Sequence, residues 1–302
     1  GSGSIALSSF ELTSGGDNSS STFSGVISGN GGLLKSGTGT LTLSGDNSYS
    51  GPTTMNGGTL QVSASAALGN STALAFDGGT LQISSAVTGA TGNVALSSGG
   101  GVVAVDAGQT FVYSGIVSGG GSLTKQGDGV LELSGANTYS GATAVTAGTL
   151  QVTGTLADAT AVTVSQSATY SLGADDTIGS LAGGGSVQLS NYQLQAGGDN
   201  TSTTFSGVIS GTGGLTKSGT GELNLSGENT YSGATTVQNG SIHIQAPSNT
   251  SGLSASTALT VESGGLFKAE SGGTTNVGSL AGAGTVEIVS ANDVFEVGAD
   301  NS

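Results

Sequence analysis

A segment of forty residues occurs three times in this chain of 302 residues. The first copy spans residues 23–62 and reads FSGVISGNGGLLKSGTGTLTLSGDNSYSGPTTMNGGTLQV. The other two copies, residues 113–152 and 205–244, align with it without a gap. Repetition of this strength usually fixes the whole architecture, because each unit buries its apolar face against its neighbours.

A shorter period runs inside these three repeat blocks. Leu41 is followed by Leu60, 19 residues on, and then by Leu81, 21 residues further. Leu131 is likewise followed by Leu150 after 19 residues. A spacing of about 20 residues is typical of parallel solenoids and is shorter than a propeller blade or an ankyrin unit.

Apolar and polar residues alternate in short runs such as TLTL, TLQV and VLEL, which is a strand pattern. The alternation points Leu41 and Leu60 inward, and Thr42 and Gln61 toward water. Gly, Asn, Asp and Ser supply the corners between strands. The sequence therefore predicts an all-β fold, a single-stranded right-handed parallel β-helix (solenoid) of about 15 coils. Residues 63–68 are the one modest helical candidate.

The composition fits a narrow core better than a globular one. The chain has 58 Gly and 2 Pro, and its hydrophobic fraction of 34% is below the roughly 45–50% of an ordinary domain. Disorder is the alternative for such a chain, but alternating runs of β-branched residues argue against it. No linker is visible, so we expect one continuous β-helix over residues 1–302, as a fragment of a longer array.

The charge excludes several classes of partner. The net charge is −15, with 19 acidic residues against 4 lysines and no arginine. Binding to nucleic acid needs clustered Lys or Arg, so we expect no nucleic-acid partner. No apolar run is long enough to cross a bilayer, and we expect no direct membrane insertion by this fragment. The absence of Cys excludes disulfides and thiolate metal sites.

The chain offers little material for catalysis. His243 is the only histidine, and it lies between Ile242 and Ile244 on the outward face of an expected strand. We expect it to be exposed to solvent, because Gln61 and Gln151 occupy the same position in the other blocks. No G-x-S-x-G elbow occurs that would mark a nucleophile for a triad.

Acidic residues give no clear site either. Asp175 and Asp176 are adjacent in a turn, and neighbours on a strand would point to opposite faces, which does not suit a pair for polysaccharide cleavage. Asp17, Asp199 and Asp300 recur in turns and are interpreted as turn caps, since too few oxygens gather there for calcium. We therefore expect no enzyme, no catalytic residues, no metal and no cofactor.

Two residue types recur at fixed positions of the blocks. One set consists of Lys35, Lys125 and Lys217. The other set consists of Tyr49, Tyr139 and Tyr231. We expect the lysines to face outward and to discourage lateral strand pairing, and the tyrosines to pack structurally in turns. Copies about 90 residues apart lie four or five coils apart, so neither set forms a patch.

The repeated motif is S-G-x-I-S-G-x-G-x-L-x-K-x-G-x-G-x-L-x-L-S-G-x-N-x-Y-S-G-x-T-x-V-x-x-G-x-L-x-V. It resembles the autotransporter-associated β-strand repeat, found in passenger domains of type V secreted proteins of Gram-negative bacteria. Departures are small: Met55 replaces the valine of Val145 and Val237, and Ile242 replaces a leucine. The resemblance implies a right-handed β-helix at the cell surface or released from it, exported through a C-terminal outer-membrane barrel.

The resemblance and the long polar faces together favour a non-enzymatic surface passenger fragment. We expect adhesion, self-association, or both, as in cell aggregation and biofilm. The partners would be a second copy through lateral contacts, or ligands on host or other cell surfaces. The alternative is a structural stalk that aids passenger folding and secretion, and a polysaccharide-processing enzyme comes third. The ligand-binding residues are unknown, but we expect them among the positions that vary between blocks.

Overall fold

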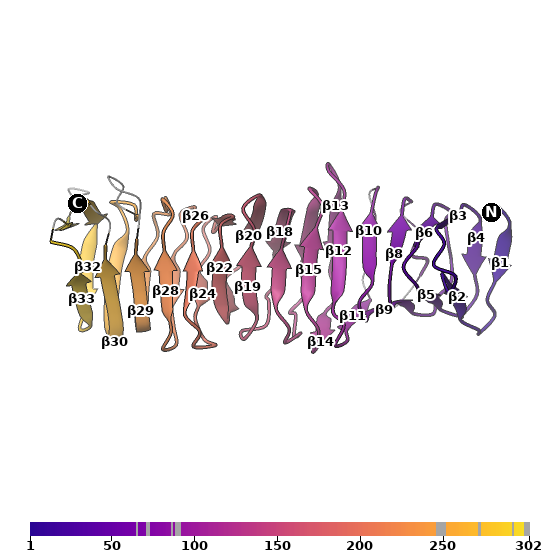
Figure 1. Ribbon diagram of the computed structural model, residues 1–302, viewed down its shortest axis with the longest axis horizontal. Coiled ribbons are helices and arrows are strands. Elements are labelled where there is room, and N and C mark those ends of the chain that lie inside the picture. The colour runs from indigo at the N-terminus through magenta and orange to yellow at the C-terminus, as the bar shows by residue number, and fades with distance from the viewer. Residues whose placement is uncertain are drawn as a thin grey trace. The chain divides into compact units, whose positions relative to one another are not determined.

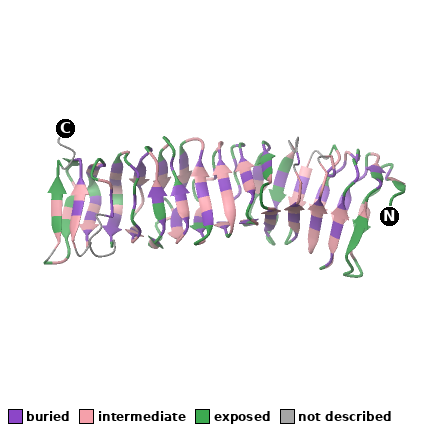
Figure 2. Ribbon diagram, turned by 90° about the horizontal axis from the view of Figure 1, so that it is seen from above, coloured by how far each residue is buried: buried purple, intermediate pink, exposed green. Residues whose placement is uncertain are grey.

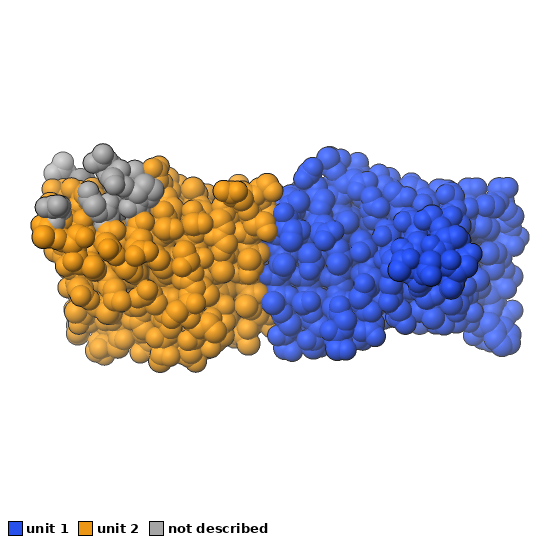
Figure 3. All heavy atoms as spheres, in the orientation of Figure 1, with its two compact units in different colours: residues 1–154 blue, residues 155–302 orange. Residues whose placement is uncertain are grey.

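The computed structural model describes residues 1–64, 66–70, 73–85, 87, 92–245, 252–270, 273–291 and 293–298. It divides into two compact units, Gly1–Gly154 and Thr155–Ser302 (Figure 3). Each unit is a parallel β-solenoid, and the two together contain about 14 turns (Figure 1). The predicted fold class is thus confirmed, with a coil number close to the expected 15. One continuous β-helix over residues 1–302 stays a prediction.

Three faces of the first unit carry parallel strands. One face stacks β3 (Ser21–Phe23), β6 (Thr40–Leu43), β8 (Thr59–Val62), β10 (Thr80–Ile83), β12 (Gly101–Val105), β15 (Leu123–Gln126) and β17 (Thr143–Val145). A second face stacks β2 (Leu12–Ser14), β5 (Leu33–Lys35), β7 (Thr53–Met55), β9 (Ala73–Phe76), β11 (Asn93–Leu96) and β14 (Val117–Gly119). The remaining ladders pair β1 (Ser4–Ala6) with β4 (Val26–Ser28), and β13 (Thr110–Tyr113) with β16 (Val130–Leu133) and β18 (Gly148–Val152).

The second unit is built in the same way. One face stacks β19 (Ala161–Val164), β22 (Ser180–Gly183), β25 (Thr203–Phe205), β28 (Glu222–Leu225), the second halves of β29 (Thr235–Ile244) and β30 (Ala258–Ala269), and β33 (Thr285–Ile288). Another stacks β21 (Asp176–Ile178), β24 (Leu194–Ala196), β27 (Leu215–Lys217), the first halves of β29 and β30, and β32 (Ser279–Gly282). Further ladders join β20 (Ala168–Leu172), β23 (Ser186–Gln188) and β26 (Val208–Ser210), and β31 (Thr274–Val277) with β34 (Val294–Val297).

The strand register follows the 20-residue period of the sequence. Leu41 pairs with Leu60, and Leu60 pairs with Leu81, as the spacing predicts. Leu131 pairs with Leu150 in the second block. Because side chains alternate along a strand, these leucines all point inward and stack on one another. Buried and more exposed residues alternate along most strands of each unit (Figure 2).

Successive blocks of the first unit do not use the same face. The strand of Lys35, β5, belongs to the ladder that runs through β7, β9 and β11. The corresponding strand of the second block, β15, belongs instead to the ladder of β8, β10 and β12. The offset of 90 residues is not a whole number of coils, so the second block is turned by one face about the solenoid axis.

The glycine of S-G-x-N in each block marks a close approach between coils. A Cβ atom at Gly135 would lie 2.3 Å from the carbonyl oxygen of Gly115 in the preceding coil. At the equivalent Gly45 and Gly227 the distance would be 2.0 Å and 1.9 Å to the preceding coil. No side chain fits there, which explains the S-G-x-N glycine of the motif.

The helical candidate at residues 63–68 is wrong for the part that the structure describes, which excludes Ser65. The backbone N–H of Ala67 donates to Ala64 O, and that of Gly69 to Ala66 O, which are the bonds of tight turns. Across the described residues, no helix is long and apolar enough to cross a bilayer.

Candidate functional site

The three block lysines lie inside the solenoid, so the prediction that they face outward is wrong. The buried set is Lys35, Lys125 and Lys217, each no more than 1% exposed. Lys125 Nζ donates to the carbonyl oxygens of Gln126 at 2.8 Å and Gly127 at 2.7 Å in its own corner. It also donates to Ala147 O of the next coil at 3.1 Å. Each lysine therefore holds a corner together and ties it to the following coil.

Simple alternation could have placed these lysines correctly. Leu123 and Lys125 are two residues apart on one strand, so they point to the same side, and Leu123 is a core residue. In the ladder, Lys125 takes the place between Val103 and Val145, both buried. Burial lowers the pKa of the Lys125 ammonium to about 8, and the negative charge of Asp128 opposes this shift.

The block tyrosines are structural, as predicted. The set of Tyr49, Tyr139 and Tyr231 is fully buried. Each phenol shares a hydrogen bond with a threonine hydroxyl four residues on, at 2.7, 2.5 and 2.6 Å in chain order. Burial raises the pKa of Tyr49 to about 12. These phenols are unsuited to acid–base chemistry near neutral pH.

A buried asparagine in each block links neighbouring coils, and the sequence reasoning did not single it out. The set is Asn47, Asn137 and Asn229. Asn229 Oδ1 accepts from the N–H of Ile209 at 2.9 Å, and its Nδ2 donates to Gly252 O at 3.0 Å. Ile209 lies on the preceding coil and Gly252 on the following one. The signal was present, because the motif fixes this Asn beside the glycine of close approach.

The turn acids that the structure describes cap their turns, as predicted. Asp17 Oδ1 accepts from the N–H of Ser19 at 3.1 Å and from its hydroxyl at 2.8 Å. The N–H of Ser19 lowers the pKa of Asp17. Asp199 makes the same two bonds with Thr201, at 2.9 and 2.7 Å. Asp300 lies outside the described residues.

Asp175 and Asp176 point to opposite sides, also as predicted. Asp175 is exposed and accepts from the N–H of Gln193 at 2.8 Å. Asp176 is 4% exposed at the start of β21, where it accepts from the phenol of Tyr170 and the N–H of Leu156. Burial raises the pKa of Asp176. The two carboxylates face no common space in which a substrate could bind.

The outward positions of β6, β8 and β10 form two uncharged rows of partly exposed side chains. We call these rows the hydroxyl–amide rows; they consist of Thr40, Thr59 and Thr80, and of Thr42, Gln61 and Gln82. Thr42 Oγ1 donates to Gln61 Oε1 at 2.8 Å, so side chains of neighbouring strands within a row bond each other and hold a fixed orientation. None of these three strands carries a charged residue, although the chain has a net charge of −15.

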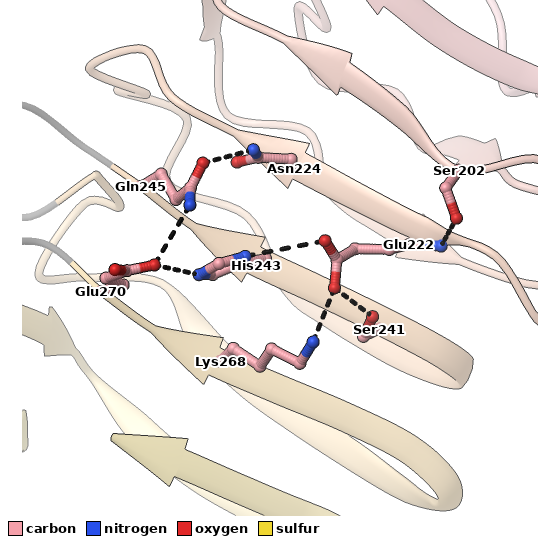
Figure 4. A network of polar contacts seen from close by, with 8 residues as sticks. All are labelled: Ser202, Glu222, Asn224, Ser241, His243, Gln245, Lys268 and Glu270. Atoms are coloured by element: carbon pink, nitrogen blue, oxygen red, sulfur yellow. Dashed lines mark hydrogen bonds and ion pairs between the residues drawn. The ribbon is translucent and has the colours of Figure 1, made fainter. Parts of the chain in front are cut away.

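A cluster of polar side chains lies on β28, β29 and β30 of the second unit and on the residues that directly follow β29 and β30 (Figure 4). His243 Nδ1 is 3.6 Å from Glu222 Oε1, and His243 Nε2 is 2.9 Å from Glu270 Oε2. Lys268 Nζ donates to Glu222 Oε2 at 2.7 Å. Only 11% of the His243 side chain is exposed. The histidine points outward from its strand as predicted, but the prediction that it is open to solvent is wrong, because its neighbours cover it.

This cluster does not have the geometry of a catalytic site. Ser241 Oγ donates to Glu222 Oε2 at 3.1 Å rather than to the imidazole, so no nucleophile is paired with a base. The imidazole occupies the space between Glu222 and Glu270, where a glycosidase would need room for a sugar or water. Within the described residues, no group of three or more His, Cys, Asp or Glu is arranged to hold a metal ion.

Comparison with known proteins agrees with the resemblance of the repeated motif. The family model of the passenger-associated-transport repeat matches residues 33–62, 123–152 and 215–244. The Adhesin BmaC autotransporter of Brucella suis biovar 1 (strain 1330) is 38% identical over 258 residues, which cover 79% of this chain. These findings identify an autotransporter passenger with repeats.

The aligned region is a large part of this chain and a small part of the Brucella adhesin. The chain spans 8% of the length of the Brucella adhesin, and no solved structure matches it.

Each family match covers the last thirty residues of a forty-residue block, from the leucine of the L-x-K strand onward. In the passenger, this part contains the buried lysine, asparagine and tyrosine of each block. The matched part therefore includes the side chains that join neighbouring coils.

Proposed function

We propose that this chain is a non-enzymatic passenger segment displayed at the surface of a Gram-negative bacterium, where it takes part in adhesion. The Brucella relative is an adhesin autotransporter, and passengers of this kind are exported through the outer membrane. The observation that carries the proposal is the pair of hydroxyl–amide rows, whose own side chains are all uncharged although the chain is strongly acidic.

The finer form of the proposal assigns adhesion to many weak contacts along these rows. One hydrogen bond contributes about 0.5–1.5 kcal/mol, so a single rung holds no partner. Neighbouring strands of the rows are about 4.8 Å apart. Once one contact has formed, the effective concentration of the next pair of groups is high, so many weak contacts together give a stable attachment. A second copy of the passenger offers rows of the same spacing, which favours homotypic aggregation. A ligand on a host cell is the other partner compatible with such a surface.

The test uses the complete passenger displayed on a Gram-negative cell. The variant replaces Thr59, Thr80 and Gln61 by Glu, which leaves the core unchanged and places charge on the rows. The matched control replaces the outward Thr54, Ala75 and Ala95 by Glu, on the ladder of β7, β9 and β11.

Surface labelling first measures export of each variant. Adherence to host cells and the settling rate of the culture then measure the function. We expect adhesion to fall for the row variant and to persist for the control. Equal losses in both would show that the rows are not the contact surface.

A second candidate is a structural stalk that aids folding and secretion. The observation that favours it is that the fixed lysine, tyrosine and asparagine of every block serve the core. Replacing the chain in the full passenger by a neutral solenoid of equal coil number separates the two. Unchanged adhesion would favour the stalk, and lost adhesion with normal export would favour direct contact.

A further inference from the structure

Both ring nitrogens of His243 face a carboxylate oxygen. Glu222 comes from the preceding coil on β28, and Glu270 directly follows β30 on the next coil. Because a neutral imidazole carries one N–H, it can donate to only one of these two carboxylates. Its other nitrogen then presents a lone pair to an anionic oxygen. The protonated ring carries two N–H groups and can donate to both.

Hydrogen bonds from neighbouring side chains favour the ionised form of both carboxylates. On β28 the group is Glu222, whose hydrogen bond from Lys268 of β30 lowers its pKa. Next to β30 the group is Glu270, whose hydrogen bond from Gln245 lowers its pKa. Glu287 on β33 pairs in register with Lys268 and adds a further negative charge. With a neutral imidazole, the charges of Glu222, Glu270, Lys268 and His243 sum to −1. With a protonated imidazole, they sum to zero.

We propose that Glu222, His243 and Glu270 form a proton-operated clasp that joins three consecutive coils of the passenger. In the protonated state the ring forms an ion pair with Glu222 of the preceding coil and with Glu270 of the following coil at once. When the ring loses a proton, one of the two links loses its donor and the three coils separate more readily. The clasp is a conformational device in addition to the proposed adhesion, and it does not depend on that function.

The clasp belongs to the third block alone among the three. The equivalent position of the first block is Gln61, and the positions that correspond there to Glu222 and Glu270 are Thr40 and Ser84. That position has the same outward direction but no carboxylate on either side. The chain thus supplies its own control environment for a histidine.

The experiment follows hydrogen exchange of the 302-residue chain between pH 5 and pH 8, corrected for intrinsic exchange rates. We expect amides of residues 241–245 and 266–269 to exchange about tenfold faster at the upper pH, the size of one lost hydrogen bond to a charged group. Because His243 is the only histidine, its single imidazole resonance gives the proton occupancy in the same samples. The exchange change should follow that titration.

Two variants make the inference falsifiable. His243→Gln restores the residue of the other blocks and should abolish the pH response without unfolding the coils. The double variant His243→Gln with Gln61→His moves the single histidine to the first block, and should titrate with no change of exchange in the coils around residue 61. A response that persists in His243→Gln would overturn the clasp. So would an equal response around the transplanted histidine, or no response in the original chain.

Discussion

Replacing Lys125 by Met would test the most unexpected feature of the core. Met keeps the length and most of the apolar stem of lysine, so it removes the ammonium with little change in packing. The three carbonyl oxygens of Gln126, Gly127 and Ala147 then lose their common donor. Two of them lie in the corner of the same coil and one in the next coil.

The expected cost comes from two opposing effects. Hydrogen bonds to a charged group contribute about 1.5–3 kcal/mol each, and three of them are lost. Removing a buried charge regains several kcal/mol of desolvation, which offsets much of that loss. We therefore expect the free energy of opening the coil to fall by about 2–4 kcal/mol, as for other broken buried networks.

Native-state hydrogen exchange at β15 and β17 measures this local free energy directly. The control is Lys268→Met, which removes the chain's remaining lysine. Lys268 Nζ donates to the partly exposed carboxylate of Glu222, and this ion pair contributes less than about 1 kcal/mol. An outward, solvated Lys125 would make the two variants equal. That equality would refute the buried cage of carbonyls.

Three further predictions follow from the same contacts. Burial lowers the pKa of Lys125 from 10.5 to about 8, so between pH 8 and pH 10.5 the unfolded chain binds more protons than the folded chain. The difference in unfolding free energy between the unmutated chain and Lys125→Met should therefore rise from pH 8 to pH 10.5, as measured by paired urea titrations. Tyr139→Phe should lose about 1–2 kcal/mol in urea unfolding, because Thr143 Oγ1 loses its buried partner; no loss would contradict the structural role. Gly135→Ala should cost about 3 kcal/mol or more from its 2.3 Å clash with Gly115 O, whereas Gly120→Ala, with no atom within 4 Å, should stay within about 1 kcal/mol.

The sequence predicted the strand register because two periods reinforce each other. A slip of one residue would turn Leu60 and Val62 outward, so alternation fixes the pairing of Leu41 with Leu60. The turn caps of Asp17 and Asp199 were also predictable, because each carboxylate bonds a residue only two positions further along the chain. Contacts this local can be predicted from residue type and spacing.

The burial of Lys125 was missed because residue type was weighed above position. Lysine is rarely buried, and only the folded corner shows why it is buried here. With φ near +72°, Gly127 bends the corner so that two carbonyls converge, and the next coil brings the third. The alternation of side chains along the strand can be read from the sequence. The meeting of three carbonyl oxygens around Lys125 Nζ can be seen only in the folded chain.

His243 shows the same division more sharply. The sequence determined that its side chain points outward, since that follows from the strand period alone. Coil length and register bring Glu222 and Glu270 to its two sides, although they are 21 residues before it and 27 after it. The sequence by itself thus determined the strands, their period and their inward face. Only the tertiary structure decided which side chains meet on the outer surface, because that depends on how far each turn advances the chain around the solenoid.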